Sequence, residues 1–261
     1  MNKNFPLISI IINCHNGERY LHECINSVLS QSYQNWEIIF WDNKSSDNSR
    51  KILNKLKDKR IKYFESKTFL NLYHARNLAV KKSNGDYISF LDTDDMWTSD
   101  KLEKQINFIK SNPNYKIIYS NYYVLKKNKK FIMYKNQMPQ GFITQKLLDF
   151  YGIGINTVIL DKKVFNKYNF EKDFNIIGDF VFFIQASQEY QIGYIQEPLL
   201  VYRIHNNNFT SKNLKLYINE LSLWIKENER LLSKDKYSLK KQKIYIMKLK
   251  IKSLLSKLNL Y

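Results

Sequence analysis

The feature that most constrains this chain is a short apolar strand that ends in three carboxylates. Residues 85–97 read G-D-Y-I-S-F-L-D-T-D-D-M-W. An apolar run this short, bounded by a glycine and by acids, is typical of a buried strand rather than of a helix. Asp92, Asp94 and Asp95 follow the run. Ligands of open α/β sheets bind beyond the carboxyl ends of the strands, so a site is expected here.

Carboxylates crowded at one strand end repel one another unless a cation lies between them. Oxygen ligands suit Mg²⁺ or Mn²⁺, and a magnesium site commonly uses one or two carboxylates and leaves other positions to water and substrate phosphates. The acids therefore indicate a metal–phosphate site. The alternative is a polar turn that caps the strand and starts a helix at Ser99 and Asp100, and the D-x-D pattern alone does not decide between the two.

Apolar runs and amphipathic segments alternate along the first hundred residues. The expected strands cover 7–12, 36–41, 61–64 and 87–91, and the expected helices cover 18–31, 45–56 and 74–83. This alternation predicts a parallel sheet with helices on its faces. Neither G-x-G-x-x-G nor a phosphate-binding P-loop follows the first strand, which excludes a dinucleotide-binding domain and a P-loop enzyme.

The second half of the chain is less regular. We expect strands at 117–125, 152–160, 194–195 and 199–202, a basic hairpin tip at 126–130, helices at 100–110 and 180–186, and helical structure beyond 211.

The net charge of +18 would suit nucleic acid, an anionic membrane surface or anionic small substrates. Residues 234–261 hold nine lysines and one acid, so the charge is concentrated away from the first strands. No zinc-finger or RNA-binding pattern accompanies it, which makes nucleic acid an unlikely partner. The start of the chain predicts no signal peptide, and Cys14 and Cys24 fit no disulfide framework, so we expect a cytoplasmic protein.

The lysine-rich tail also carries an approximate apolar stripe: Ile244, Met247, Ile251, Leu254, Leu255 and Leu258. This pattern fits a helix lying on an anionic lipid surface at the inner face of the cell membrane. It equally fits a helix packed on its own domain or on a partner.

Five separated motifs point to one family. They are residues 9–33, 36–49, 75–77 with 85–97, 177–184 and 202–207. In this order they resemble the motifs of the inverting, GT-A-fold bacterial glycosyltransferases of family 2. The resemblance implies a GT-A-like α/β fold: a mixed, mainly parallel sheet with helices on both faces, plus a helical basic C-terminal tail. It divides the chain into a nucleotide-sugar-binding half (1–98), an acceptor-binding half (99–211) and the extension 212–261.

The resemblance also implies roles for individual residues. The nucleotide sugar would be bound by residues after the strands and by two near the end of the matched region: Asn13, His15, Asp42, Asn43, Arg76, Asp92, Thr93, Arg203 and His205. Asp94 would be the first ligand of Mn²⁺ or Mg²⁺, with Asp95 and His205 beside it. The family often has Tyr in place of His15 and Asp in place of Asn43. The resemblance therefore does not fix which nucleobase the nucleotide sugar carries.

Asp179 matches the catalytic base of the family. A carboxylate at the start of an apolar helix could have a raised pKa, which would suit a base, although a helix cap is the alternative. Gly178 stands where the family more often has Glu, so a contact to the acceptor could be missing.

The resemblance implies a metal-dependent inverting glycosyltransferase. It would move a sugar from a nucleotide-diphosphate sugar, with UDP favoured, to a glycan or lipid-linked glycan in bacterial surface polysaccharide synthesis. The alternative is a non-catalytic, basic protein that binds a membrane surface or nucleic acid.

Overall fold

The computed structural model describes residues 5–206 and 208–257, and its centre is one mixed sheet. Asn207 of the last motif and Leu258 of the apolar stripe lie outside the described residues. The strands are β1 (Ile8–Cys14), β2 (Trp36–Asp42), β3 (Ile61–Glu65), β4 (Tyr87–Phe90), β5 (Met96–Trp97), β6 (Tyr115–Lys126), β7 (Lys129–Ile132), β8 (Ile159–Asp161) and β9 (Gln191–Ile204). Their order is β3-β2-β1-β4-β8-β6-β9-β5, and β7 pairs with β6.

The first four strands in this order are parallel, as the alternation of strands and helices predicts. The sheet then changes direction, because β8 is antiparallel to both β4 and β6, while β9 runs parallel to β6. This is the mixed, mainly parallel sheet expected from the resemblance.

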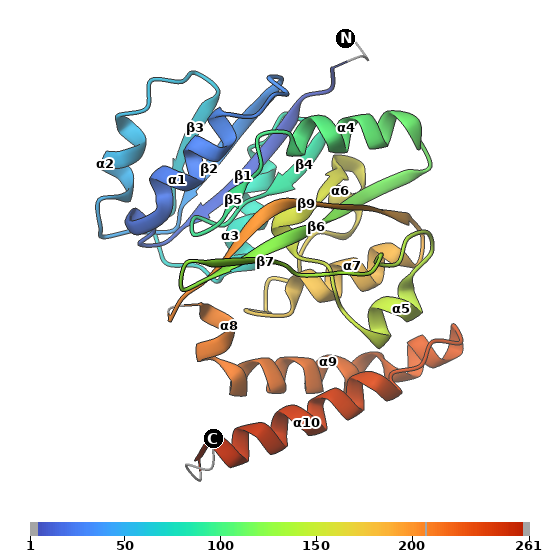
Figure 1. Ribbon diagram of the computed structural model, residues 1–261. Helices are drawn as coiled ribbons and strands as arrows, with labels where there is room; N and C mark the ends of the chain where they lie inside the picture. Colours follow the sequence, from blue (N-terminus) through green and yellow to red (C-terminus); the bar gives the residue numbers. More distant parts are fainter. Residues whose placement is uncertain (1–4, 207, 258–261) are drawn as a thin grey trace.

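Helices cover both faces of the sheet (Figure 1). They are α1 (Glu18–Leu29), α2 (Ser49–Asn54), α3 (Leu72–Lys81), α4 (Lys101–Ser111), α5 (Thr144–Asp149), α6 (Lys162–Tyr168), α7 (Gly178–Ser187), α8 (Phe209–Lys212), α9 (Leu214–Lys234) and α10 (Lys240–Lys257). Alternate residues of a strand point to opposite faces. Ile10 and Ile12 therefore pack in the core with α1 and α4, whereas Ile11 packs in the core with α3 and α7.

Two predicted segments of the second half are wrong. Within 152–160 only the end is strand, because residues Ile155–Thr157 form a 3₁₀ turn before β8. Residues 194–195 and 199–202 belong to a single strand, β9, which continues through Pro198. Its register with β6 shifts at Asn121, opposite Pro198. Such an irregularity lets a strand accommodate a residue that has no N–H to donate.

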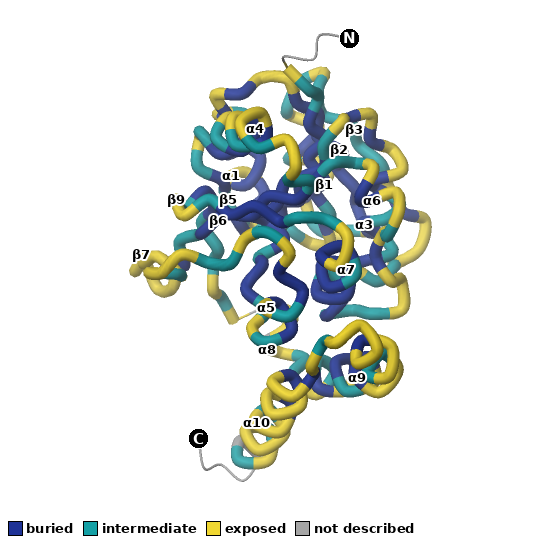
Figure 2. Tube along the Cα trace, turned by 90° about the vertical axis from the view of Figure 1, so that its right-hand side faces the viewer, coloured by how far each residue is buried: buried dark blue, intermediate teal, exposed yellow. Residues whose placement is uncertain are grey.

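The helical extension is a hairpin in which α9 lies next to the domain and α10 lies outside it (Figures 1 and 2). Ile218, Leu221 and Trp224 of α9 are buried, whereas most of α10 is exposed (Figure 2). Among the described helices, none combines the length and the apolar character that crossing a bilayer requires.

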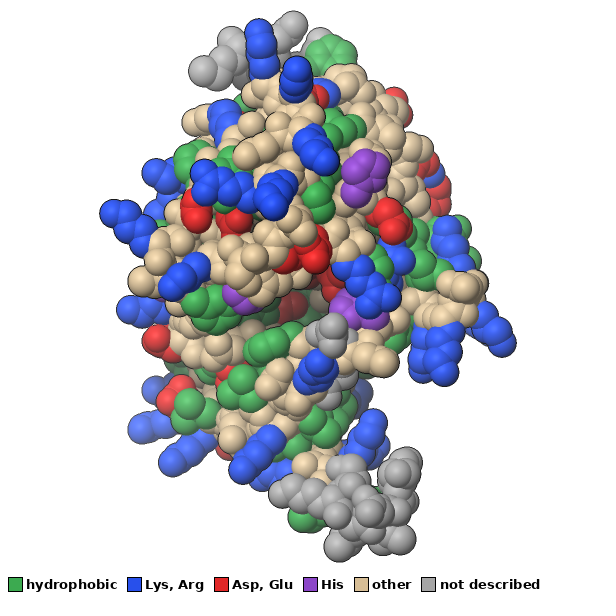
Figure 3. All heavy atoms as spheres, turned by 90° about the vertical axis from the view of Figure 1, so that its left-hand side faces the viewer, with side chains coloured by type: hydrophobic (Ala, Val, Ile, Leu, Met, Phe, Trp, Pro, Cys, Tyr) green, Lys and Arg blue, Asp and Glu red, His purple; other side chains and the backbone are tan. Residues whose placement is uncertain are grey.

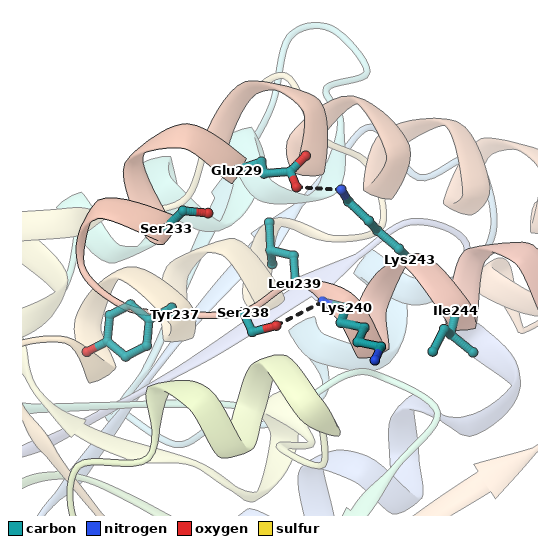
Figure 4. Close-up of a pocket in the computed structure, with 8 residues that line it drawn as sticks. All are labelled: Glu229, Ser233, Tyr237, Ser238, Leu239, Lys240, Lys243 and Ile244. Carbon is teal, nitrogen blue, oxygen red and sulfur yellow. Dashed lines mark hydrogen bonds and ion pairs between the residues drawn. The ribbon is translucent and has the colours of Figure 1, made fainter.

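A hollow of about 420 Å³ lies at the turn between α9 and α10 (Figure 4). Glu229 and Lys243 form an ion pair on its wall, and the backbone N–H of Lys240 donates to Ser238 Oγ. None of its lining residues belongs to the acidic cluster after β4.

The backbone at the start of β4 is packed directly against β1. A Cβ atom on Gly85 would lie 2.6 Å from the backbone N of Ser9 and 2.8 Å from the carbonyl of Leu7. These are backbone atoms of the central strand, so they cannot move aside cheaply.

We therefore expect Gly85→Ala to lower the free energy of unfolding by about 1–3 kcal/mol, the usual cost of overpacking. A Cβ on Gly154 makes only ordinary contacts, the nearest at 3.6 Å, so Gly154→Ala is the matched control. Urea unfolding of both variants measures the difference. Equal stabilities would contradict the close approach of β4 to β1.

Candidate functional site

Acidic side chains gather in the middle of the face shown in Figure 3, with histidine and basic side chains around them. The segment after β4 supplies Asp92, Asp94 and Asp95. The parallel strands β1 and β2 end beside it, because Cys14 and Asp42 are paired in register. The carboxyl ends of β1 and β2 therefore lie next to each other, and β4, the other neighbour of β1, leads into the acidic segment.

Asp92 is held by two donors. Arg76, a buried residue of α3, donates through Nη2 to Oδ1 at 2.6 Å. The amide of Asn156 donates to Oδ2 at 3.0 Å. Charge-assisted bonds of this kind fix a carboxylate in both position and orientation.

Asp95 is almost completely buried, and both of its oxygens are occupied. Oδ1 accepts the backbone N–H of Arg203 at 2.9 Å, and Oδ2 accepts the Asn156 amide at 2.6 Å. Burial, together with the charges of Asp94 and Asp92, raises the pKa of Asp95 well above its ordinary value. The observed contacts of Asp95 join the acidic segment to β9 and to the 3₁₀ turn.

Asp94 faces His205, the residue that follows β9. Asp94 Oδ2 lies 2.8 Å from His205 Nε2. The guanidinium of Arg203 donates through Nε to the Asp94 carbonyl at 3.1 Å and through Nη2 to Glu23 at 2.7 Å. Burial, and then the charge of Asp92, raises the pKa of Asp94.

The side chains around Asp94 provide only part of the ligand set that a hard divalent cation requires. The Asp94 carboxylate faces the His205 imidazole. The nearby charge of Asp92 disfavours the ionised form of Asp94, and a bound cation would relieve this repulsion. Within the described residues no group of three or more His, Cys, Asp or Glu side chains converges as a metal site. Asp94 and His205 could supply two ligands, and water and a substrate phosphate would have to supply the others.

The residues predicted to hold the base and ribose lie at the ends of β1 and β2. Both polar atoms of the Asn13 amide are buried and have no hydrogen-bond partner among the described residues. His15 is exposed; its Nδ1 lies 3.0 Å from the Asn43 carbonyl, and its ring meets Phe69 edge-on at 4.7 Å. Thr93 is half-buried, and its side chain lies against Gly17.

Asp42 and Asn43 are both buried and both make structural contacts. Asp42 accepts the N–H of Ser45 and the hydroxyl of Tyr63, each at 2.8 Å. The Asn43 amide bonds both the N–H and the carbonyl of Leu70. Asn43 thereby fixes the segment before α3.

Asp179 lies in the first turn of α7, where two tyrosines bind it. Tyr73 donates to Oδ1 at 2.8 Å and Tyr151 donates to Oδ2 at 2.9 Å. Burial raises the pKa of Asp179, although both hydroxyl bonds oppose the shift. A Cβ on Gly178 would lie 2.6 Å from the Tyr73 ring. The tyrosine ring therefore fills the space that a larger residue would need at position 178.

Helix α3 connects the acidic segment after β4 with Asp179. Tyr73 and Arg76 of α3 bind Asp179 and Asp92 respectively, and Asn77 of the same helix bonds the backbone of Phe170. Sequence reasoning missed Tyr73, Tyr151 and Asn156. The position of Tyr73 three residues before Arg76 was the one local signal, since residues at this spacing share a helix face.

Comparisons with known proteins identify the family and the fold of the chain. Residues 9–186 match the family model of glycosyl transferase family 2. Two relatives from Escherichia coli are named as β-1,3-glucosyltransferases acting with UDP-Glc and α-D-GlcNAc-diphosphoundecaprenol. The first is 40% identical over 63% of this chain and 64% of its own length, and the second is 37% identical over 60% and 61%. The matches thus span less than two thirds of these relatives.

Solved structures show the same fold at low identity. S. aureus TarS in complex with UDP-GlcNAc gives a TM-score of 0.67 at 16% identity, covering 84% of this chain and 66% of that chain. A mannosyltransferase from Pyrobaculum calidifontis in complex with GDP-Man and Mn²⁺ gives 0.65 at 13% identity, covering 85% and 64%. The fold is GT-A-like, and the chain belongs to glycosyl transferase family 2.

Proposed function

We propose that this chain is a metal-dependent inverting glycosyltransferase that uses a UDP-sugar and a lipid-linked glycan acceptor. One observation carries the proposal: side chains of a single helix, α3, bind both Asp92 and Asp179 and so orient the two carboxylates relative to each other. A transferase needs a donor site and a base in a fixed relation. The names of the Escherichia coli relatives support UDP and a diphosphate-linked lipid acceptor.

Residues 1–98 form the donor half in this proposal. The unpartnered Asn13 amide and the exposed His15 ring beside Phe69 would receive the nucleobase, by hydrogen bonding and stacking respectively. Asp42, Asn43 and Thr93 would line the ribose side. Arg203 and His205 would close over the diphosphate.

Asp94 and His205 would hold Mn²⁺ or Mg²⁺, with Asp92 and Asp95 as neighbouring acids. The bound ion would neutralise the charge that develops on the leaving diphosphate. Arg76 and the Asn156 amide keep Asp92 oriented in that site, while Asp95 bonds the backbone of β9.

Asp179 would be the general base. As the acceptor oxygen forms its bond to the anomeric carbon, Asp179 takes the hydroxyl proton, and the nucleotide diphosphate leaves with the electron pair of the broken C–O bond. Attack opposite the leaving group inverts the configuration. A pKa raised by burial brings the carboxylate closer to the working pH, which favours base catalysis. Residues 99–211 would form the acceptor half.

The extension 212–261 would bring the enzyme to an anionic membrane surface. The predicted stripe is exposed at Ile244, Met247, Ile251 and Leu254, while Ile246 is buried against the protein. Exposed lysines of α10 accompany this stripe: Lys240, Lys241, Lys243, Lys248, Lys250 and Lys252. An apolar strip flanked by lysines suits the interface of an anionic bilayer, where a lipid-linked acceptor is located.

Nucleotide binding tests the donor site. We expect wild-type protein to bind UDP in the presence of Mn²⁺ and to bind it only weakly without the metal. In Asp94→Asn, Mn²⁺ should no longer strengthen UDP binding, because the variant removes the charge that attracts the cation. Isothermal titration with UDP, GDP and dTDP measures this. UDP binding by the wild-type protein that does not depend on Mn²⁺ would contradict the proposed site. Equal UDP affinity of wild type and Asp94→Asn in the presence of Mn²⁺ would contradict it as well.

Substitution of the base tests the chemistry. Asp179→Asn keeps the shape and one acceptor oxygen for the tyrosines but cannot take a proton, so we expect transfer to fall by about 10²–10⁴-fold, the usual contribution of a general base. UDP affinity should stay at the wild-type value. Initial rates with UDP-glucose and a GlcNAc-diphosphate-lipid acceptor give the first quantity, and titration gives the second. Wild-type transfer by Asp179→Asn would remove the assignment.

Vesicle binding tests the membrane surface. Met247→Asp with Ile251→Asp places two charges in the stripe, and we expect it to reduce sedimentation with phosphatidylglycerol vesicles. The matched control is Leu223→Asp with Leu231→Asp, which alters two exposed leucines of α9. Equal sedimentation of the wild type and both double variants would exclude membrane binding through the stripe. Binding to neutral vesicles as strong as binding to phosphatidylglycerol vesicles would exclude an electrostatic role of the lysines.

A further inference from the structure

A buried carboxylate of the extension binds the backbone that leads into the Asp179 helix. Glu220 of α9 is only 7% exposed. Its Oε1 accepts the N–H of Asn175 at 2.8 Å, and its Oε2 accepts those of Ile176 at 2.9 Å and Ile177 at 3.2 Å. The side-chain amide of Asn175 donates to Oε1 as well, at 3.3 Å. The partners of this buried charge are therefore N–H groups on one short segment.

This segment is the start of α7, which has no side-chain cap of its own. The N-cap residue Ile177 carries an apolar side chain. The first N–H groups of a helix have no partner within the helix, and a negative charge beside them is favourable. Glu220, 43 residues further along the chain, binds the N–H of the N-cap residue Ile177 and the two N–H groups before it, and so places its negative charge beside this helix end. Asp179 lies only two residues after Ile177, so the same carboxylate fixes the path of the backbone that carries it.

A second contact from α9 acts on the neighbouring residue. The ring of Trp224 packs edge-on against Phe180 with 4.8 Å between ring centroids, and Trp224 is 4% exposed. Tyr151, which donates to Asp179, packs on the same Phe180 ring at 5.3 Å. The extension thus contacts the backbone before Asp179 and the side chain after it. Figure 1 shows α9 running directly below α7.

We propose that Glu220 is a positioning residue for Asp179, and that the helical extension completes the catalytic site through it. The proposal rests on the proposed role of Asp179 as base. The family match ends at residue 186, so this contribution comes from outside the matched segment. The extension therefore has a role in transfer that is separate from its proposed binding to membrane.

The experiment compares Glu220→Ala and Glu220→Gln with Glu227→Ala. Glu227 lies seven residues further along the same helix and is exposed, which makes it the matched control. Each protein is assayed for transfer kcat with UDP-glucose and a GlcNAc-diphosphate-lipid acceptor, and for UDP affinity with Mn²⁺. Amide hydrogen exchange over residues 175–180 reports the capping bonds directly and needs no acceptor.

We expect Glu220→Ala to lower kcat by about 100-fold, the cost of misplacing a catalytic group by about 1 Å. UDP affinity should not change, because the hydrogen bonds observed for Glu220 go to residues 175–177, outside the proposed donor half. Exchange over residues 175–180 should become faster in Glu220→Ala and stay unchanged in Glu227→Ala. Glu220→Gln retains one acceptor oxygen, so its kcat should lie between those of wild type and Glu220→Ala; it also serves as the test if the alanine variant does not fold.

Two results would overturn the inference. One is wild-type kcat in folded Glu220→Ala or Glu220→Gln while Asp179→Asn is inactive, which would leave the base assignment intact. The other is a parallel loss of kcat and UDP affinity, which would mean a general loss of structure. Wild-type transfer by Asp179→Asn would instead remove the proposed function on which the inference rests.

Discussion

The structure depends on keeping three carboxylates together at the end of one strand. Asp92, Asp94 and Asp95 occupy three of four consecutive positions, where their charges repel. Partners from two other parts of the chain hold them: Arg76 of α3 binds Asp92, while at the end of β9 the backbone N–H of Arg203 binds Asp95 and His205 faces Asp94. The cost of gathering like charges is thus offset by contacts that also fix β9 and α3 relative to β4.

Helix α3 links the acidic segment after β4 to Asp179. Its buried face presents Tyr73 to Asp179 and Arg76 to Asp92, so neither carboxylate can shift without disturbing the other's partner. Gly178 belongs to the same arrangement, because the Tyr73 ring lies where any Cβ at position 178 would be. The departure from the usual family residue at this position therefore has a packing reason here. An arrangement of this kind gives catalytic groups the fixed geometry that transfer requires.

The parallel strands and the acids that follow them could be predicted from the sequence, because both are local patterns. Apolar runs of the right length ended in polar residues, and four of them are the adjacent strands β3, β2, β1 and β4. Tyr151 and Asn156 could not be predicted, since their partners lie 28 and about 60 residues away and no spacing rule links them. The prediction for 152–160 was wrong for the same reason: buried hydrogen bonds of Asn156 stabilise a turn where apolar periodicity favours a strand. The roles predicted for Asn43 and Asp95 stay predictions: Asn43 bonds the backbone of Leu70, and Asp95 bonds the backbone N–H of Arg203 and the Asn156 side-chain amide.

The cap that α9 places on α7 has a consequence for the order in which the protein assembles. Chains fold from the N-terminus during synthesis at about 5–20 residues per second. The strands that end around Asn13 and Asp42 emerge from the ribosome well before Glu220, which follows the segment it binds by 43 to 45 residues. Residues 175–177 therefore leave the ribosome about 2–9 seconds before the carboxylate that binds them. The start of α7 reaches its observed hydrogen bonding only after α9 has been made and has packed on it.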